Sequence, residues 1–354
     1  LDRVVNQDLS ETFSRVALGT IEGGNRVIMA SIWTSTGYEL AIVSPGENSY
    51  SYRESTGTVV PLTNYQNFLG PVDDVVAVNG FMVFLQTGTN TVFHSNLNDI
   101  TTYNALDFET VTRVETVVGL FSYRGQLYIA GENDILPYTF IGGTLFVFQF
   151  QPNSTLPGGI ENVYSKTVIG RAFFFLGGET NEAPAVWMST GGYPEKISTE
   201  AIEARIRGNS RINQAFMMNF AMDGGKFVVL QLGKDCFVYD LMTGDWHTRT
   251  SKYGDTQQPW RVKCINQAYG RLLVGDSFDG RIGSLSSSDT EYGINVLRSF
   301  STMPFDNKGR HIALLISNAD PKRVDFLYFS SKLLTRNRSY LYPISKRDIS
   351  SYVY

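Results

Sequence analysis

Histidine and cysteine side chains, the usual metal ligands and catalytic groups, are scarce in this sequence. Its 354 residues include three histidines and two cysteines: His94, His247, His311, Cys236 and Cys264. No histidine lies at metal-ligand spacing from another histidine or from a cysteine, so a zinc site is not expected. His247 falls in a turn region and is expected to be structural or solvated rather than catalytic. Both cysteines occur in apolar strand-like runs and are predicted to be buried free thiols.

Carboxylate pairs are the other groups that could do chemistry, since such pairs hydrolyse glycosides or bind calcium. Asp73 with Asp74, and Asp276 with Asp279, are the notable pairs. Turn formation accounts for the second pair, and a loop between β elements accounts for the first. The sequence also contains no nucleophile elbow of the GxSxG type and no phosphate loop ending in Gly-Lys-Ser/Thr. It therefore predicts a protein that is not an enzyme and that has no metal and no cofactor.

Basic and tyrosine side chains gather in residues 291–354. This segment holds ten Lys or Arg against five Asp or Glu, a net charge of +5, which leaves −9 for residues 1–290 because the whole chain carries −4. Tyr and Arg are frequent anchors at protein interfaces. The segment is expected to be a solvated β extension or, in the sharper interpretation, a docking segment for an acidic partner or phosphate. The docking residues would be Arg323, Lys332, Arg336, Arg338, Tyr340, Tyr342, Lys346 and Arg347.

The elements that must position these residues follow from a repeat. A glycine followed by an apolar strand recurs at intervals of 56, 45, 45, 55 and 45 residues, at Gly24, Gly80, Gly125, Gly170, Gly225 and Gly270. A period near 45 with about four strands per repeat is typical of β-propeller blades. Runs such as Phe227–Leu230 are apolar at consecutive positions, so both faces of such a strand must be covered, as they are between neighbouring blades.

The sequence therefore predicts an all-β protein with three parts. Residues 20–290 are expected to form a propeller of about six blades, and residues 291–354 a basic C-terminal β extension. In the N-terminal segment, residues 1–19, the run Thr12–Leu18 is a candidate strand to close the ring by joining the last blade. No apolar run approaches the roughly 18 residues that a membrane helix needs, so this chain alone is not expected to bind a membrane.

One helix is expected, in the stretch "STEAIEARIRG". Ser198 or Thr199 can cap its N-terminus and Gly208 can end it. Ile202 and Ile206, four positions apart, share one face of such a helix. The insertion accounts for the longer interval before the fifth glycine of the repeat.

The same region carries a family resemblance. The segment "EAPAVWMSTGGYPEKISTEAIEARI", residues 182–206, is followed by "GKFVVLQLGKDCFVYDLMTGDWHTRTS" and "GRLLVGDSFDGRIGSL". In this order, over roughly residues 70–290, the motifs resemble those of the packaged-DNA stabilisation proteins of short-tailed bacteriophages. Each motif alone is a weak signal, and their ordered succession carries the resemblance.

The resemblance implies a structural virion protein of the phage tail, assembled in the host cytoplasm. Six copies would form a hub or nozzle ring below the portal and adaptor, which extends the DNA channel and retains the packaged DNA. Tail fibres or spikes and a tail needle or plug would attach to it. A body charged at −9 would repel phosphates, so double-stranded DNA is expected to pass without specific binding. The alternative is a propeller that recognises a receptor or glycan as a tail module, with a glycan hydrolase as the third interpretation.

Overall fold

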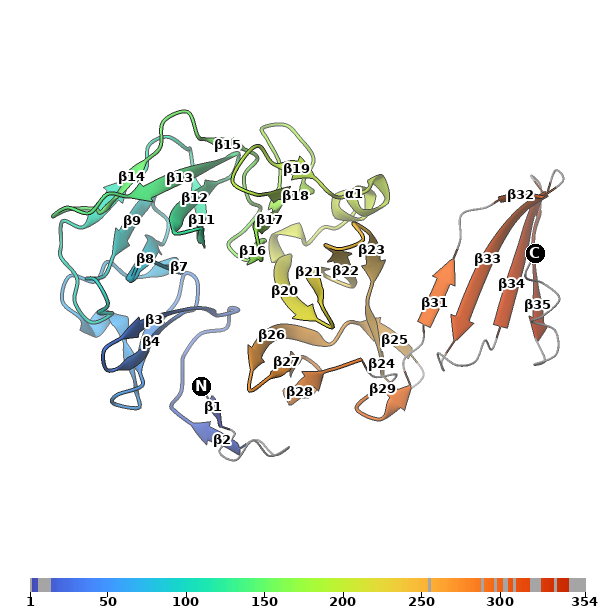
Figure 1. Cartoon of the computed structure of the whole chain (residues 1–354), viewed down its shortest axis with the longest axis horizontal. Coiled ribbons are helices and arrows are strands. Elements are labelled where there is room, and N and C mark those ends of the chain that lie inside the picture. Colours follow the sequence, from blue (N-terminus) through green and yellow to red (C-terminus); the bar gives the residue numbers. More distant parts are fainter. Residues whose placement is uncertain are drawn as a thin grey trace. The chain divides into compact units, whose positions relative to one another are not determined.

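The computed structural model of the chain consists almost entirely of antiparallel β-strands, with one α-helix (Figure 1). It describes residues 2–5, 14–253, 256–287, 290–295, 298–301, 305–307, 310–318, 326–333 and 336–343. Its contacts divide the chain into two compact units, residues 1–248 with 265–271 and residues 249–264 with 272–354.

The first two blade sheets have the strand orders β3-β4-β5-β6 and β7-β8-β9-β10. Their strands are β3 (Ile28–Thr34), β4 (Gly37–Val43), β5 (Ser49–Arg53), β6 (Thr58–Pro61), β7 (Val72–Val78), β8 (Phe81–Gln86), β9 (Thr91–His94) and β10 (Phe108–Thr110). A short 3-10 helix, η1 (Leu62–Asn64), lies in the connection between the two sheets.

The third, fourth and fifth sheets repeat the same antiparallel order. Their strands are β11 (Val117–Tyr123), β12 (Gln126–Gly131), β13 (Asp134–Phe140), β14 (Phe148–Phe150), β15 (Leu156–Pro157), β16 (Lys166–Ile169), β17 (Ala172–Gly177), β18 (Ala185–Ser189), β19 (Glu195–Lys196), β20 (Phe216–Met222), β21 (Gly225–Leu232), β22 (Asp235–Asp240) and β23 (Trp246–Thr248). Here β15 is a fifth strand of the third sheet and pairs with β13. Figure 1 shows the five sheets following one another in chain order, with the first strand of each on the inner side.

A sixth sheet has the order β26-β27-β28, formed by β26 (Val262–Ala268), β27 (Arg271–Asp276) and β28 (Ile282–Leu285). The six sheets are the blades of a six-bladed β-propeller. The predicted fold class is thus confirmed.

The remaining strands form separate small sheets. They are β1 (Asp2–Val5) with β2 (Ser14–Ala17), β24 (Thr250–Tyr253) with β25 (Thr256–Pro259), β29 (Thr290–Glu291) with β30 (Ile294–Asn295), and a C-terminal sheet of β31 (Arg298–Ser301), β32 (Phe305–Asn307), β33 (Arg310–Asn318), β34 (Phe326–Leu333) and β35 (Arg336–Pro343). The run Thr12–Leu18, expected to close the ring, contains β2, whose partner is β1. The structure thus gives this strand a different partner from the last blade.

At Gly80, Gly125, Gly170 and Gly270 the recurring glycine lies in the turn between the first and second strands of a blade, whereas Gly225 is the first residue of the second strand β21. Gly80 and Gly125 have φ angles of 83° and 73°, and the residue before each also has positive φ, which is the signature of a two-residue type I′ hairpin. Gly24 does not belong to this series, because it precedes the first strand β3. The glycine of the first blade is Gly37, which opens the second strand β4 as Gly225 opens β21. The interval from Gly37 to Gly80 is 43 residues, so the long first interval of the predicted repeat disappears.

Apolar strands are covered on both faces, as their sequences predict. In β17, Phe173 and Phe175 pack into the core shared with the third sheet, whereas Phe174 and Leu176 pack into the core shared with the fifth sheet. Val228 of β21 also lies in the second of these cores and is fully buried. Consecutive apolar residues therefore reflect a strand enclosed between two neighbours.

The predicted helix is α1 (Glu200–Arg207), followed by a 3-10 turn, η2 (Ile212–Gln214), in the connection between the fourth and fifth sheets. Ile202 and Ile206 are 5% and 1% exposed and pack against both sheets, as expected. Thr199 is the N-cap residue by backbone conformation but makes no side-chain cap hydrogen bond. Gly208 ends the helix in a right-handed conformation, with φ of −77°. In the described part of the chain, no helix has the length and apolar character needed to cross a membrane.

Candidate functional site

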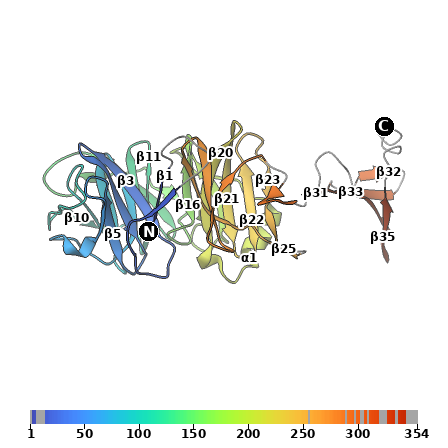
Figure 2. The same cartoon turned by 90° about the horizontal axis from the view of Figure 1, so that it is seen from below.

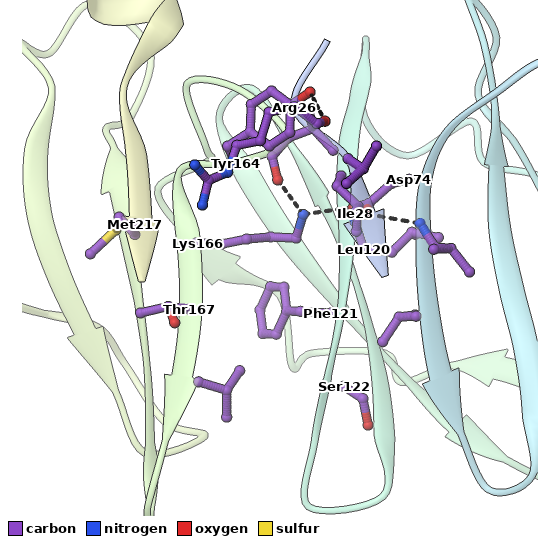
Figure 3. Close-up of a pocket in the computed structure, with 15 residues that line it drawn as sticks. Arg26, Ile28, Asp74, Leu120, Phe121, Ser122, Tyr164, Lys166, Thr167 and Met217 are labelled. Carbon is purple, nitrogen blue, oxygen red and sulfur yellow. Dashed lines mark hydrogen bonds and ion pairs between the residues drawn. The ribbon is translucent and has the colours of Figure 1, made fainter. Parts of the chain in front are cut away.

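The first strands of the first five sheets, together with the residues just before them, line a common cavity (Figure 3). Its volume is about 350 Å³, and it receives side chains from β3, β7, β11, β16 and β20 or from the segments leading into them. Its polar lining residues are Arg26, Asp74, Ser122, Tyr164, Lys166 and Thr167.

Asp74 and Lys166 form an ion pair in this cavity. Nζ of Lys166 lies 2.6 Å from Oδ2 of Asp74, and the two side chains are 11% and 1% exposed. The same Oδ2 accepts the backbone N–H of Leu120 at 2.7 Å, and Oδ1 accepts that of Val75 at 2.9 Å. Lys166 also donates to the carbonyl oxygen of Val163 at 2.5 Å. One carboxylate therefore joins the first strands of the second, third and fourth sheets.

Burial raises the pKa of the Asp74 carboxyl above its ordinary value. The ammonium of Lys166 and the backbone donors Leu120 and Val75 act in the opposite direction but do not outweigh the loss of water around the carboxylate. Such a pair is costly to assemble and still more costly to break, because removal of one partner leaves the other charge buried alone.

A second contact chain crosses the same cavity. The hydroxyl of Tyr164 donates to the carbonyl oxygen of Arg26 at 2.6 Å, and the Arg26 guanidinium lies 4.0 Å from the ring centroid of Phe216. Burial raises the pKa of Tyr164 to about 12, so this phenol remains a neutral donor at physiological pH. These contacts connect the segment before β3 with the fourth and fifth sheets.

The polar side chains of this cavity hold neighbouring sheets together, and we call the set Arg26, Asp74, Tyr164 and Lys166 the clamp. The ammonium and the carboxylate neutralise each other, and the phenol is used as a donor to the backbone. Among the residues that the structure describes, no group of three or more His, Cys, Asp or Glu could hold a metal ion. The side chains at the inner strands thus hold blades together.

The first carboxylate pair of the sequence lies at this site, and its predicted location is wrong. Asp73 and Asp74 belong to the strand β7 and not to a loop. Asp73 Oδ1 accepts the hydroxyl of Thr87 at 2.8 Å, while Asp74 points into the cavity (Figure 3). Both carboxylates have structural roles, as predicted, although in a different setting.

Both members of the second carboxylate pair bind the turn between β27 and β28, as expected, since Asp276 Oδ1 accepts the backbone N–H of Phe278 at 2.7 Å, and Asp276 also forms a buried ion pair. Asp279 accepts the backbone N–H of Arg281 at 3.2 Å and stabilises the turn, as expected. Asp276 ends β27 and lies 2.5 Å from the guanidinium of Arg261, with side chains 1% and 6% exposed. The Arg261 guanidinium also lies 4.8 Å from the ring centroid of Phe278.

The histidines occupy unrelated places. His94 is 2% exposed, its Nδ1 lies 2.8 Å from the carbonyl oxygen of Ser95, and its Nε2 accepts the N–H of Val147. His247 is exposed on β23, and His311 belongs to β33. The structural role expected for His247 is consistent with its cross-strand pairing in the fifth sheet.

The two cysteines are free, as predicted, but only Cys236 is buried. Cys264 is exposed because β26 is buried only at its first residue, Val262, and its following residues are partly or fully exposed. The predicted burial of Cys264 is therefore wrong.

The predicted docking residues fall on the C-terminal sheet or outside the described residues. Lys332 belongs to β34, and alternate positions of β35 carry Arg336, Arg338, Tyr340 and Tyr342. Arg323, Lys346 and Arg347 lie outside the described residues. Their docking role stays a prediction.

Sequence reasoning missed Lys166, Tyr164 and Arg26, which complete the clamp. A signal was present in β7, because an aspartate inside the apolar run "VDDVVAV" is rarely buried without a partner. The partner is 92 residues away in sequence, and no local pattern identifies it.

Comparisons with known proteins agree with this architecture. Residues 3–290 match the model of a family described as phage stabilisation, bacteriophage P22 Gp10, β-propeller. None of the curated proteins matches the chain.

Two solved structures are similar at low identity. The extracellular domain of the one-component system BT4673 from B. thetaiotaomicron is 13% identical, with a TM-score of 0.42, and the match covers 90% of this chain and 46% of that one. Sqt1 from Saccharomyces cerevisiae is 9% identical, with a TM-score of 0.43, and the match covers 89% of this chain and 92% of that one. The chain thus spans about half the length of the first structure.

Proposed function

Since its residues 3–290 match the family model, the chain belongs to the bacteriophage P22 Gp10 β-propeller family, and on that premise we propose that it forms the hub or nozzle of a short phage tail. In this proposal six copies form a ring below the portal and adaptor. The ring extends the DNA channel and retains the packaged DNA. It is a component of the virion tail, assembled in the host cytoplasm, and its role is structural rather than enzymatic.

The observation that supports a ring of several copies is the clamp at the inner strands. The Asp74–Lys166 pair, with a 2.6 Å separation, joins the second and fourth sheets across a cavity of about 350 Å³. The major groove of B-DNA alone is about 12 Å wide. A duplex therefore does not fit through the middle of one chain, which supports the proposal of a DNA channel that runs between copies.

The charge of the chain suits a channel wall that does not hold DNA. Residues 1–290 carry a net charge of −9. Nonspecific DNA binding depends on Lys and Arg that replace counterions along the phosphates, and an acidic wall lacks that driving force. In the proposal the genome slides along the wall during ejection, and a steric gate retains it beforehand.

Other tail parts attach to the same ring in this proposal. Tail fibres or spikes and a tail needle or plug are the expected partners. The basic segment 291–354, with a net charge of +5, is the proposed docking segment. Its positive charge complements an acidic partner surface or a phosphate.

The experiment uses DNA-filled phage heads prepared without this protein. Purified chain is added, and the fraction of heads that retain nuclease-protected DNA is measured together with the number of copies bound. A hub predicts that protection rises to a plateau at about six copies per head, the number set by a closed cyclic ring. Absence of both binding and protection would reject the hub, and binding to a glycan array would then identify the receptor-binding alternative.

A further inference from the structure

The blade sheets of residues 28–248 each have two ends. The hairpin end of a sheet carries the turns from its first to its second strand and from its third to its fourth strand. The opposite end carries the turn from the second to the third strand and the connections to the neighbouring sheets. The helix α1 lies in one of these connections, and Figure 2 shows it at the lower rim in that view.

Three cations at the hairpin ends of the third, fourth and fifth sheets have no carboxylate partner among the described residues. Arg124 and Arg171 lie in the turns between the first and second strands of the third and fourth sheets. Lys226 lies beside the corresponding turn of the fifth sheet. All three side chains are exposed, and none forms an ion pair with a described residue. We call Arg124, Arg171 and Lys226 the cationic patch.

The three cations lie side by side across two blade boundaries. The guanidinium of Arg124 lies 5.1 Å from the ring centroid of Tyr123, and the hydroxyl of Tyr123 donates to the carbonyl oxygen of Arg171 at 2.5 Å. A Cβ at Gly170, the residue before Arg171, would lie 2.8 Å from Nζ of Lys226. Like charges at such short range repel one another, so the patch favours a negatively charged partner.

Arg124 departs from the turn chemistry of the other blades. A type I′ hairpin needs positive φ at both turn residues, which favours Asn-Gly and Asp-Gly. The second and fifth sheets follow this rule with Asn79-Gly80 and Asp223-Gly224, whereas the third sheet places Arg124 at a φ of 51°. A residue that opposes the local preference is expected where it serves a function. The turn thus points to a role for this guanidinium outside its own hairpin.

Acids at the hairpin ends belong to other sheets. The third and fourth sheets have none there, because their turns at this end, residues 124–125, 141–147, 170–171 and 190–194, contain no Asp or Glu. Asp223, the acid nearest to Lys226 in sequence, is engaged in an interaction with another residue. The acids of the hairpin ends lie on the first, second and fifth sheets: Glu54, Asp99, Asp107, Asp223, Asp240 and Asp245.

The opposite ends of the third and fourth sheets carry the reverse charge. We call acidic loops the segments that hold Glu132, Glu161, Glu179 and Glu182, none of which forms an ion pair with a described residue. These segments are packed together, since the N–H of Ile160 donates to the carbonyl oxygen of Gly131 at 2.9 Å and that of Gly159 to the carbonyl oxygen of Gly178 at 3.0 Å. Burial, and then the neighbouring Glu132 carboxylate, raise the pKa of Glu161 above its ordinary value.

One copy cannot pair these two surfaces with each other. They lie at opposite ends of strands such as β12, which has six residues and spans roughly 20 Å. Exposed charges are largely screened beyond about 8 Å in physiological salt. The cationic patch and the acidic loops therefore need another molecule to supply their partners.

We propose that the cationic patch of one copy docks on the acidic loops of a second copy of this chain. This proposal rests on the proposed function, in which six copies form a ring. A closed ring of more than two copies needs two different surfaces on each copy, one for each neighbour. The third and fourth sheets present such a pair with opposite charge, and complementary charge determines which surfaces meet. Because the chain itself carries both surfaces, this complementarity selects a second copy as the partner.

Duplex DNA suits the cationic patch less well than a second copy does. Three cations release few counterions, whereas a protein that holds duplex DNA contacts about 6–10 phosphates. A duplex is also longer than the patch and would extend over the acids on the hairpin ends of the first, second and fifth sheets. A compact acidic surface can contact the patch alone.

The test exchanges the two charges. Arg171→Glu/Lys226→Glu reverses the patch, and Glu179→Lys/Glu182→Lys reverses the acidic loops. The combined variant carries all four changes and keeps the wild-type net charge of −4. Each labelled chain is titrated onto DNA-filled heads that lack this protein. Bound copies per head, nuclease-protected DNA and the melting temperature of the free chain are measured.

Two further variants accompany these chains. The matched control, Arg211→Glu/Lys234→Glu, reverses two exposed cations at the opposite end of the fifth sheet and in the connection before it. Arg124→Asn removes one cation of the patch and introduces a residue that the turn prefers. It should melt at the wild-type temperature or above and still require about threefold more chain for half-maximal filling.

The wild type and the control are expected to fill heads cooperatively. Reversal of either surface should abolish cooperativity, require about tenfold more chain for half-maximal filling and prevent DNA protection, and the combined variant should recover both. Wild-type cooperativity in either reversed variant would overturn the inference. Failure of the combined variant, with a wild-type melting temperature, would overturn it too, because the patch would then meet DNA or another acidic protein. Absence of binding by the wild type itself would reject the proposed function.

Discussion

Asp74 and Lys166 meet at 2.6 Å although they belong to the second and fourth blade sheets (Figure 3). The backbone N–H of Leu120, in the sheet between them, donates to the same carboxylate oxygen. Three blades thus share one buried charge pair, and the inner strands are held by a contact that spans 92 residues of sequence.

Lys166→Met should destabilise the chain strongly. The substitution keeps most of the side-chain volume but leaves the Asp74 carboxylate buried without its cation, which costs about 3–5 kcal/mol at such sites. The free energy of unfolding in urea measures the loss. Asp74→Leu combined with Lys166→Met should recover much of it, because no buried charge then remains. If the free energy of unfolding of Lys166→Met lay within about 1 kcal/mol of the wild-type value, which is the scale of a solvent-exposed pair, the pair would not be buried.

Tyr164→Phe should change the alkaline stability of the chain. The pKa of Tyr164 is raised to about 12 in the folded state from an ordinary value of 10.0, so the folded state keeps this proton longer than the unfolded state. Its contribution to stability is therefore complete below pH 10 and is lost as the pH rises toward 12. Chemical unfolding at several pH values between 9 and 12, the range that brackets this shift, gives the free energy of unfolding as a function of pH. Its decrease with rising pH should be shallower in Tyr164→Phe than in the wild type, by the equivalent of one proton. Equal decreases in the two proteins would contradict the role given to this phenol.

Val228→Asp should prevent folding. Val228 is fully buried in the core between the fourth and fifth sheets, and an aspartate there would place a charge without a partner between two blades. Lys226→Asp, at an exposed position of the same strand, is the matched control and should keep the wild-type melting temperature. Circular dichroism during heating distinguishes the two, and a cooperative wild-type transition in Val228→Asp would refute the burial of β21 between blades.

The assembled ring should not bind duplex DNA tightly in physiological salt. The charge of −9 on residues 1–290 opposes the approach of phosphates. Filter binding or fluorescence anisotropy with a duplex of arbitrary sequence should show no submicromolar affinity. Lowering the salt concentration should not raise this affinity steeply. Submicromolar binding at physiological salt would exclude a wall along which the genome slides.

Local features of the sequence predict the blades well because each blade is made from neighbouring residues. The turn at Gly125 and the strands around it form a hairpin whose residues are adjacent in the chain. The same holds for α1, where Ile202 and Ile206 mark the buried face. The predicted series nevertheless included Gly24 in place of Gly37, because a glycine before an apolar strand looks alike whether that strand is the first or the second of its blade.

The sequence by itself determined the all-β class, the repeat, the helix and the enclosure of strands such as β17, since period and consecutive apolar residues are local properties. Tertiary structure alone decided which charges meet. Asp74 lies in an apolar run, and only the ring-like succession of sheets brings Lys166 and Tyr164 to its cavity. Contacts between distant segments depend on how whole sheets are arranged, and the local sequence pattern of one segment does not predict that arrangement.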